Sequence, residues 1–135
     1  MPVSRKPYPI ERIISAGTYL TASGVGFVWL IIAAFLRKQV TPFVMYHIVQ
    51  SIFISIAFLL ISILGNFVYI ILYRIPIINA LPYLLNMPLD FALGLSIIQL
   101  ITSTIILYLA ITAGMGYYSY FPWVSDIING NFNRK

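Results

Sequence analysis

Long uninterrupted runs of apolar side chains alternate along this chain with short stretches where charged residues and prolines collect. Between Gln39 and Tyr73 the single side chain that ionises near neutral pH is His47. Between Phe91 and Ser125 there is no Asp, Glu, Lys, Arg or His. Because about 20 consecutive apolar residues cross the hydrocarbon core of a bilayer as a helix, the pattern predicts an all-α integral membrane protein.

These runs predict a small bundle of three transmembrane helices, over residues 13–36, 48–73 and 91–117. The first run would be about 36 Å long as a helix, which suits one tilted crossing and not two. It is also longer than the apolar core of a signal peptide, which has about 7–15 residues. In the second run Pro42 marks a helix start, and residues 43–50 are expected at the membrane interface.

The segment Ile75–Leu89 is apolar but is interrupted by Pro76, Pro82 and Pro88. Three prolines do not fit a regular spanning helix, so an interfacial or re-entrant segment is expected. Deeper insertion of this segment would give a plan of four helices instead of three. Asp90 follows, and we expect it to cap the helix that comes next.

The end of the chain is rich in aromatic side chains between Tyr117 and Trp123. Such clusters anchor helices at headgroup level, so residues 118–135 are expected to form a surface segment. Within it Pro122 would end the last spanning helix, and Ser125-Asp126 would begin a short surface helix. The whole chain, 1–135, then forms a single membrane domain.

Charge supports this picture, because only 8 % of the residues are charged, whereas a soluble domain has about a quarter. The eight basic residues lie at the edges of the apolar runs, where they would contact anionic lipid headgroups and not nucleic acid. Three spans would put four of them on each side, so the orientation stays open. They are Arg5, Lys6, Arg12, Arg37, Lys38, Arg74, Arg134 and Lys135.

The side chains needed for catalysis or metal binding are nearly absent. The chain has three acidic residues, one histidine and no cysteine, so no catalytic, cofactor or metal site is expected, and no small-molecule substrate is identified. Bound lipid is compatible with this composition. His47 could act as a pH sensor or proton relay. We favour a structural histidine at the interface, bonded to backbone or headgroup.

Small and polar residues recur at helical spacing within the apolar runs. Helices in a membrane associate through such residues, so these stripes are expected to be packing seams within the bundle. The alternative is a polar path or a docking surface for other membrane proteins. Gln99 requires buried partners that hydrocarbon does not supply. The residues are Gly26, Ser51, Ser55, Gln99, Ser103 and Gly114.

Three short motifs resemble the Tic20 family, a membrane component of the chloroplast protein-import translocon with relatives in cyanobacteria and other bacteria. The first is Glu11-Arg12-Ile13-Ile14-Ser15-Ala16 followed by Tyr19-Leu20. The second is Phe43-x-x-Tyr46-His47-x-x-Gln50-Ser51, and the third is Pro122-x-Val124-Ser125-Asp126. The family is described with four transmembrane helices, whereas the apolar runs here predict three.

The resemblance implies a non-enzymatic subunit of a protein-translocation complex or other multi-protein membrane assembly. It would lie in the plastid inner envelope or a bacterial plasma membrane, with other membrane proteins or further copies as partners. Phe43, Tyr46, His47 and Gln50 would then orient a helix, and Ser125-Asp126 would fix the C-terminal segment against it. Two alternatives stay open: a small homo-oligomeric channel or transporter, and a structural accessory subunit of a respiratory or photosynthetic complex.

Overall fold

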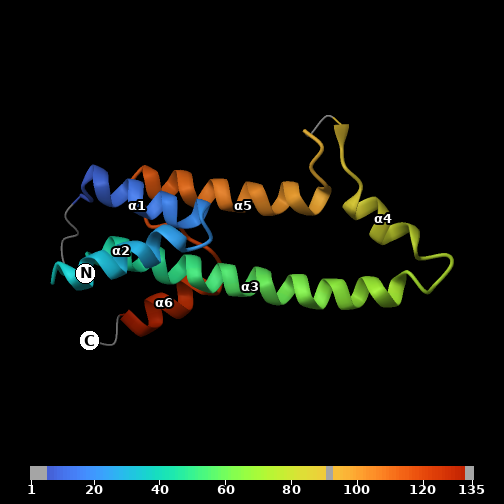
Figure 1. Ribbon diagram of the computed structural model, residues 1–135, viewed down its shortest axis with the longest axis horizontal. Helices are drawn as coiled ribbons and strands as arrows, with labels where there is room; N and C mark the ends of the chain where they lie inside the picture. Colours follow the sequence, from blue (N-terminus) through green and yellow to red (C-terminus); the bar gives the residue numbers. More distant parts are fainter. Residues whose placement is uncertain (1–5, 91–92, 133–135) are drawn as a thin grey trace. The chain divides into compact units, whose positions relative to one another are not determined.

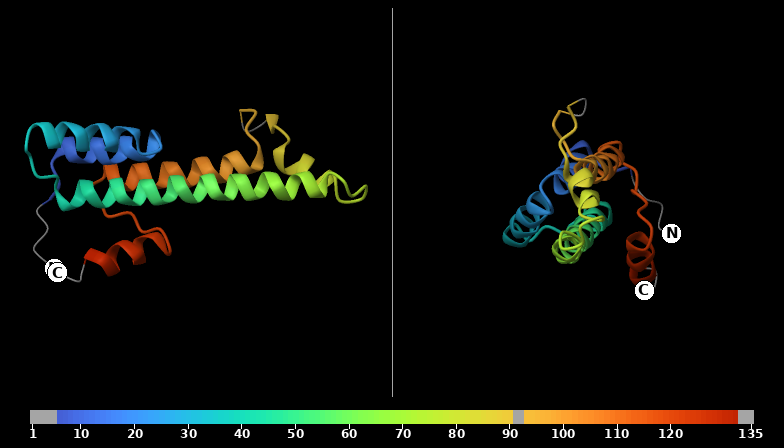
Figure 2. Two further views of the ribbon diagram at one scale, coloured as in Figure 1. Left: turned by 60° about the horizontal axis from the view of Figure 1, so that its bottom comes forward. Right: turned by 90° about the vertical axis from the view of Figure 1, so that its right-hand side faces the viewer.

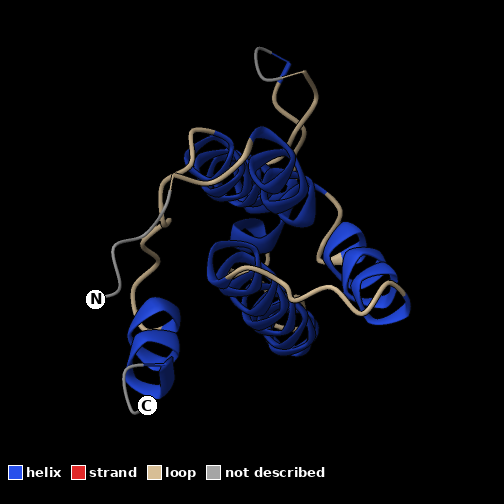
Figure 3. Ribbon diagram, turned by 90° about the vertical axis from the view of Figure 1, so that its left-hand side faces the viewer, coloured by secondary structure: helices blue, strands red, loops and turns tan. Residues whose placement is uncertain are grey.

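The structure is a computed structural model that describes residues 6–90 and 93–132. Over these residues the chain forms helices and connecting loops and no β-strand (Figures 1 and 3). The helices are α1 (Pro9–Leu20), α2 (Gly24–Phe35), α3 (Pro42–Leu72), α4 (Ala80–Asn86), α5 (Ile97–Gly114) and α6 (Val124–Phe132). The all-α class predicted from the sequence is therefore confirmed for the described residues.

Internal contacts divide the chain into two compact units. The first runs to Ser55 and resumes at Ile106, so it contains α1, α2, the first turns of α3, the end of α5 and α6. The second is Ile56–Ile105, with the rest of α3, α4 and the start of α5. The single membrane domain expected over 1–135 stays a prediction, and the two units are described separately below.

The single helix predicted over residues 13–36 is not formed, because this run folds into the two 12-residue helices α1 and α2. They lie side by side as a hairpin (Figure 2). Ala22 and Ser23 reverse the chain in the left-handed backbone region, with φ of 47° and 77°. At 1.5 Å per residue each helix is about 18 Å long, well short of the hydrocarbon thickness of about 30 Å.

Local side-chain bonds determine where α1 begins and ends. The Glu11 carboxylate accepts the backbone N–H of Tyr8 at 2.7 Å, and Pro9 occupies a first-turn position where no N–H is needed. At the far end, the Thr21 hydroxyl bonds to the Gly17 carbonyl at 2.8 Å and accepts the Val25 N–H at 3.0 Å. Thr21 thereby bonds to the last turn of α1 and to the first turn of α2, and so stabilises the turn that joins them.

Two helices, α3 and α5, are long and apolar enough to cross a bilayer. The α3 helix begins at Pro42, as the sequence predicts, and its 31 residues make it about 46 Å long. The α5 helix is shorter than the predicted span 91–117, because it occupies only Ile97–Gly114. In their most apolar stretches only 22 % and 17 % of the residues are buried, unlike the core helix of a soluble protein.

The core of the first unit lies where α1 and α2 cover the start of α3. Phe43, Val44 and Ile48 are buried there together with Ile14 of α1. Trp29 and Leu30 of α2 pack against this cluster. Residues 43–50, expected at a membrane interface, are therefore largely enclosed by protein, because the hairpin that the sequence pattern did not reveal lies over them.

In the second unit the segment 75–89 contains a short helix, α4, instead of a continuous span. Pro82 lies in its first turn, where the missing N–H costs no hydrogen bond. The expected cap at Asp90 is wrong, since α5 begins at Ile97. Ser96 and Gln99 cap α5 reciprocally: Gln99 N–H bonds to the Ser96 hydroxyl at 3.3 Å, and Ser96 N–H to Gln99 Oε1 at 2.9 Å.

The C-terminal part of the first unit turns back after α5. Gly116, with φ of 88°, follows the last turn of α5, so the helix ends before Pro122 and not at it as predicted. A loop leads to α6, which begins at Val124, one residue before the predicted start. This loop and the first turn of α6 supply the groups described next.

Candidate functional site

A buried network of hydrogen bonds joins α1, the start of α3 and the C-terminal segment of the first unit. The Tyr19 hydroxyl of α1 lies 2.6 Å from Gln50 Oε1 and 2.8 Å from His47 Nδ1, both on α3. Tyr19, His47 and Gln50 are almost completely excluded from solvent, with exposures of 4 %, 0 % and 0 %. Polar groups removed from water to this degree require partners, and here they find them in one another.

The amide of Gln50 connects this pair to the C-terminal segment. Its Nε2 donates to the Ser119 carbonyl at 3.0 Å and to the Ser125 hydroxyl at 3.1 Å. The Tyr46 hydroxyl, one helical turn earlier on α3, reaches the same two acceptors, each at 3.0 Å. Gln50 and Tyr46 of α3 therefore bind the C-terminal segment through the same two acceptors, the Ser119 carbonyl and the Ser125 hydroxyl.

Ser125 receives these bonds at the first turn of α6. Its hydroxyl also accepts the backbone N–H of Phe121 at 2.8 Å and lies 3.4 Å from the Ser119 carbonyl. Ser119 in turn bonds through its own hydroxyl to Thr112 and to the Leu109 carbonyl of α5. The start of α6 is thus attached both to α3 and to the end of α5.

The acceptors in the network determine where its protons lie. The Ser119 carbonyl only accepts, so the Gln50 NH₂ must face it, which turns Gln50 Oε1 towards Tyr19. The single hydroxyl proton of Tyr19 then goes to Gln50. His47 Nδ1 must consequently carry a proton and donate it to the Tyr19 oxygen. In the described chain His47 Nε2 has no hydrogen-bond partner.

Aromatic rings enclose His47 on several sides. The rings of Phe43 and Tyr46 meet it edge-on, with centroids 4.5 and 5.4 Å away. Tyr118 stacks nearly parallel to it at 6.1 Å and also contacts Phe43 and Tyr46 edge-on. His47 was expected to be a structural histidine at the membrane interface, bonded to backbone or headgroup; in this structure its Nδ1 bonds to the Tyr19 hydroxyl inside a protein cage, and its place relative to a membrane stays a prediction.

A second polar contact attaches the hairpin turn to α3. The hydroxyls of Ser23 and Ser51 lie 2.8 Å apart, and the Ser51 hydroxyl also donates to the Ile48 carbonyl at 3.0 Å. Near it, Gly26 of α2 packs so closely that an added Cβ would lie 2.9 Å from Ile48 Cγ1 and 2.9 Å from Thr18 Cγ2. Ser51 and Gly26 therefore lie at the seam between the hairpin and α3.

The other residues singled out from the sequence lie outside the network. Pro122 and Asp126 are exposed, and the Asp126 carboxylate accepts the Tyr120 hydroxyl at 3.3 Å and raises the Tyr120 pKa by its charge. Gln99 is exposed and caps α5, so the buried partners expected for it are not found. Ser55 and Ser103 are half-buried, and Gly114 is exposed beside Ala16 of α1.

Two members of this site were not predicted from the sequence. Ser119 takes part mainly through its backbone carbonyl, which no residue pattern reveals. Ser23 takes part because the chain reverses there, and the only signal was the group of weak helix formers Thr21, Ser23 and Gly24 within an apolar run. Tyr118 was expected at headgroup level, but it packs against the cage around His47.

This network of hydrogen bonds can hold segments of the chain together, and we call it the clasp. Apart from His47 Nε2, its donors and acceptors are directed at one another, and within the described ranges no group of three His, Cys, Asp or Glu side chains is placed to hold a metal ion. Its effect is to fix the hairpin, α3 and the start of α6 to each other. No protein-family model, curated protein or solved structure matches this chain.

Proposed function

We propose that this protein is a Tic20-like membrane subunit that works within a protein-translocation complex or another multi-protein membrane assembly, without catalysis of its own. The supporting observation is that its three Tic20-like motifs converge. Tyr19 of the first motif, Gln50 of the second and Ser125 of the third are connected through hydrogen bonds of 2.6 and 3.1 Å. Motifs far apart in sequence thus have a common task, which is to hold one unit together.

An integral position in the membrane is supported by the surfaces of α3 and α5. Large apolar side chains of α3 beyond Ser55 are mostly exposed, and water would have to cover them in a soluble protein. Lipid covers them without cost. The most exposed include Leu59, Ile61, Leu64, Phe67 and Ile70. We place the protein in a bacterial plasma membrane or a plastid inner envelope, as the resemblance implies.

The hairpin changes the number of longer helices from the three expected from the sequence. With α1 and α2 as separate elements, the described residues form four helices of at least 12 residues, α1, α2, α3 and α5. Four is also the number by which the Tic20 family is described. The first two are too short to cross a bilayer singly, so we propose that they enter it as a hairpin beside α3.

Site-specific photo-crosslinking tests the proposal. A photoreactive residue would replace Leu60 or Phe67, which are exposed on α3, with the fully buried Ile48 as the matched control. Cells would carry a precursor protein arrested during translocation by a folded C-terminal domain. We expect the exposed positions, and not position 48, to form adducts with the precursor or with other membrane proteins of one assembly.

Two outcomes would contradict the proposal. Adducts confined to lipid, together with migration as a monomer on native gels, would show that the protein does not work as a subunit of an assembly. Adducts only between copies of this chain, together with ion or solute flux in reconstituted vesicles, would favour the homo-oligomeric channel instead.

A further inference from the structure

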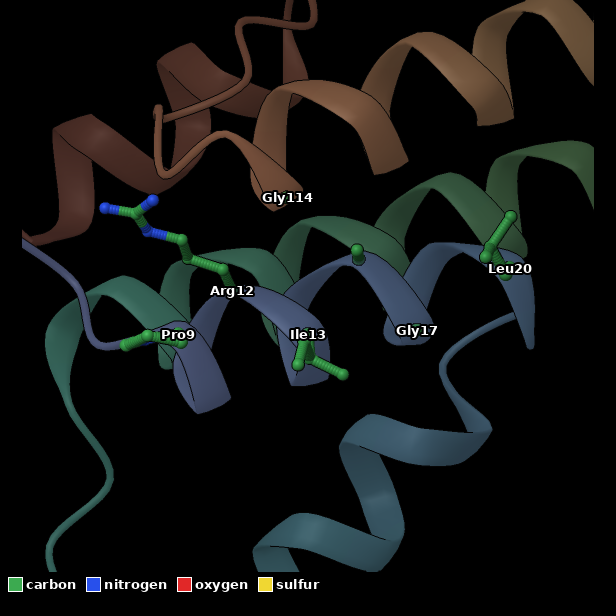
Figure 4. A pocket seen from close by; sticks show the side chains of 7 residues that line it. Pro9, Arg12, Ile13, Gly17, Leu20 and Gly114 are labelled. Carbon is green, nitrogen blue, oxygen red and sulfur yellow. The ribbon is translucent and has the colours of Figure 1, made fainter.

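An open apolar groove of about 510 Å³ runs along α1 beside the end of α5, within the first unit (Figure 4). Its walls are apolar, with Ile13 and Leu20 exposed at 67 % and 60 %. Small residues form its floor: an added Cβ on Gly114 would lie 3.8 Å from the Cβ of Ala16. Its single charged group is the guanidinium of Arg12, near the start of α1.

The guanidinium of Arg12 is held in place by the backbone around it. Its Nε donates to the Pro7 carbonyl at 3.2 Å. Gly116 lies directly beside it, and a Cβ there would approach Arg12 Nε to 2.8 Å and Cζ to 3.1 Å. A side chain at position 116 would therefore displace the guanidinium, quite apart from the strain of a φ of 88°. Arg12 is positioned, while four of its five N–H donors have no partner among the residues that the structure describes.

The positive charge of Arg12 has no counterpart inside the described chain. No carboxylate there forms an ion pair with it, and the neighbouring Glu11 points its carboxylate at the backbone N–H of Tyr8. A planar guanidinium pairs with phosphate through two parallel hydrogen bonds. An uncompensated guanidinium at one end of an apolar groove fits a ligand with an anionic phosphate and an apolar tail.

We propose that this groove binds one anionic phospholipid, with its phosphate on Arg12 and an acyl chain along Ala16, Gly17 and Gly114. The proposal rests on the membrane position proposed above. From Arg12 to Leu20 the groove follows α1 for about 12 Å, so it accommodates the upper part of one acyl chain. Arg12 would lie at headgroup level, where anionic lipids attract basic side chains.

Native mass spectrometry of the full chain released from detergent tests this site. The protein would be offered phosphatidylglycerol or phosphatidylcholine with identical acyl chains. We expect one phosphatidylglycerol to be retained preferentially. Arg12→Gln should lower its retention about tenfold, as the loss of a charge-assisted pair implies. Gly114→Leu, which fills the floor and leaves Arg12 intact, should also lower it, whereas Arg37→Gln at the end of α2 should not.

Equal retention of the two lipids, or an equal loss in Arg12→Gln and Arg37→Gln, would overturn the proposal, because binding would then reflect general charge attraction. Retention unchanged by Gly114→Leu would exclude the groove as the seat of the acyl chain. Thermal unfolding of each variant in the same detergent verifies its fold. Carbonate extraction of membranes separates the two proposals: a protein that resists extraction but shows no lipid preference refutes only the lipid site.

Discussion

The side-chain amide of Gln50 donates to the backbone carbonyl of Ser119, 69 positions later in the chain, at 3.0 Å. This bond fixes the orientation of the amide and, through it, the direction of the bonds to Tyr19 and His47. It also joins the start of α3 to the loop before α6. Gln50 thereby connects Tyr19 of α1 to Ser119 in the loop before α6.

Replacing Gln50 with leucine should destabilise the protein. The change leaves the buried hydroxyl proton of Tyr19 without its acceptor, while the Ser119 carbonyl keeps the Tyr46 hydroxyl as a donor, and an unsatisfied buried group costs about 1–3 kcal/mol. Chemical unfolding in mild detergent, followed by circular dichroism, measures the loss. Gln39→Leu is the matched control, since Gln39 is exposed, and it should change stability by less than about 0.5 kcal/mol. Equal effects of the two substitutions would refute the role of Gln50.

The protonation of the two ring nitrogens of His47 tests the direction of the hydrogen bonds in the network. Because the chain has one histidine, ¹⁵N labelling of histidine gives the two ring nitrogens of His47 alone. We expect a neutral ring with the proton on Nδ1, and Tyr19→Phe should perturb that nitrogen by removing its acceptor. A spectrum with the proton on Nε2 would contradict the donation from His47 to the Tyr19 oxygen.

Substitution of glycine by alanine should lower the stability of the protein at Gly26 and raise it at Gly65. Gly26→Ala places a methyl group 2.9 Å from Ile48 and Thr18, and such overpacking costs about 1–3 kcal/mol. Gly65→Ala meets open space in the middle of α3 and should stabilise that helix by up to about 1 kcal/mol. Unfolding curves of both variants under identical conditions measure the two effects. A neutral Gly26→Ala would mean that α2 does not approach α3 this closely.

The hairpin makes a prediction about sidedness. Ile10 near the start of α1 and Leu36 after the end of α2 should lie on the same side of the membrane, whereas a single crossing puts them on opposite sides. The native chain has no cysteine, so single cysteines at these two exposed positions are labelled cleanly by an impermeant maleimide. If the two cysteines are labelled from opposite faces of sealed vesicles, residues 13–36 cross the membrane once and the hairpin is refuted.

The helical class and several helix starts followed from the sequence because they have local causes. Pro42 begins α3, and the start of α6 lies one residue from Ser125, as expected from proline and from polar residues at helix starts. The break between α1 and α2 was missed because it contains neither proline nor charge. It depends on Ala22 and Ser23 in the left-handed region, where Ser51 of α3 bonds to Ser23.

The start of α5 has a local signal in the sequence. Ser96 and Gln99 have the Ser-x-x-Gln spacing of a capping box, and this signal lies six residues after Asp90, where the end of the proline-rich segment predicts the helix start. The candidate site was anticipated only in part. Residue patterns indicated Tyr46, Gln50 and Ser125, but the acceptor that they share is the main-chain carbonyl of Ser119, which depends on the tertiary fold.

A double-mutant cycle between Tyr46 and Ser125, 79 positions apart, tests most directly whether the second and third motifs form one clasp. Tyr46→Phe, Ser125→Ala and the double variant would be unfolded under the same conditions. We predict a coupling free energy of about 0.5–1.5 kcal/mol, because each single substitution removes the same hydrogen bond. Additive effects within about 0.3 kcal/mol, as found for residues that do not touch, would contradict the clasp.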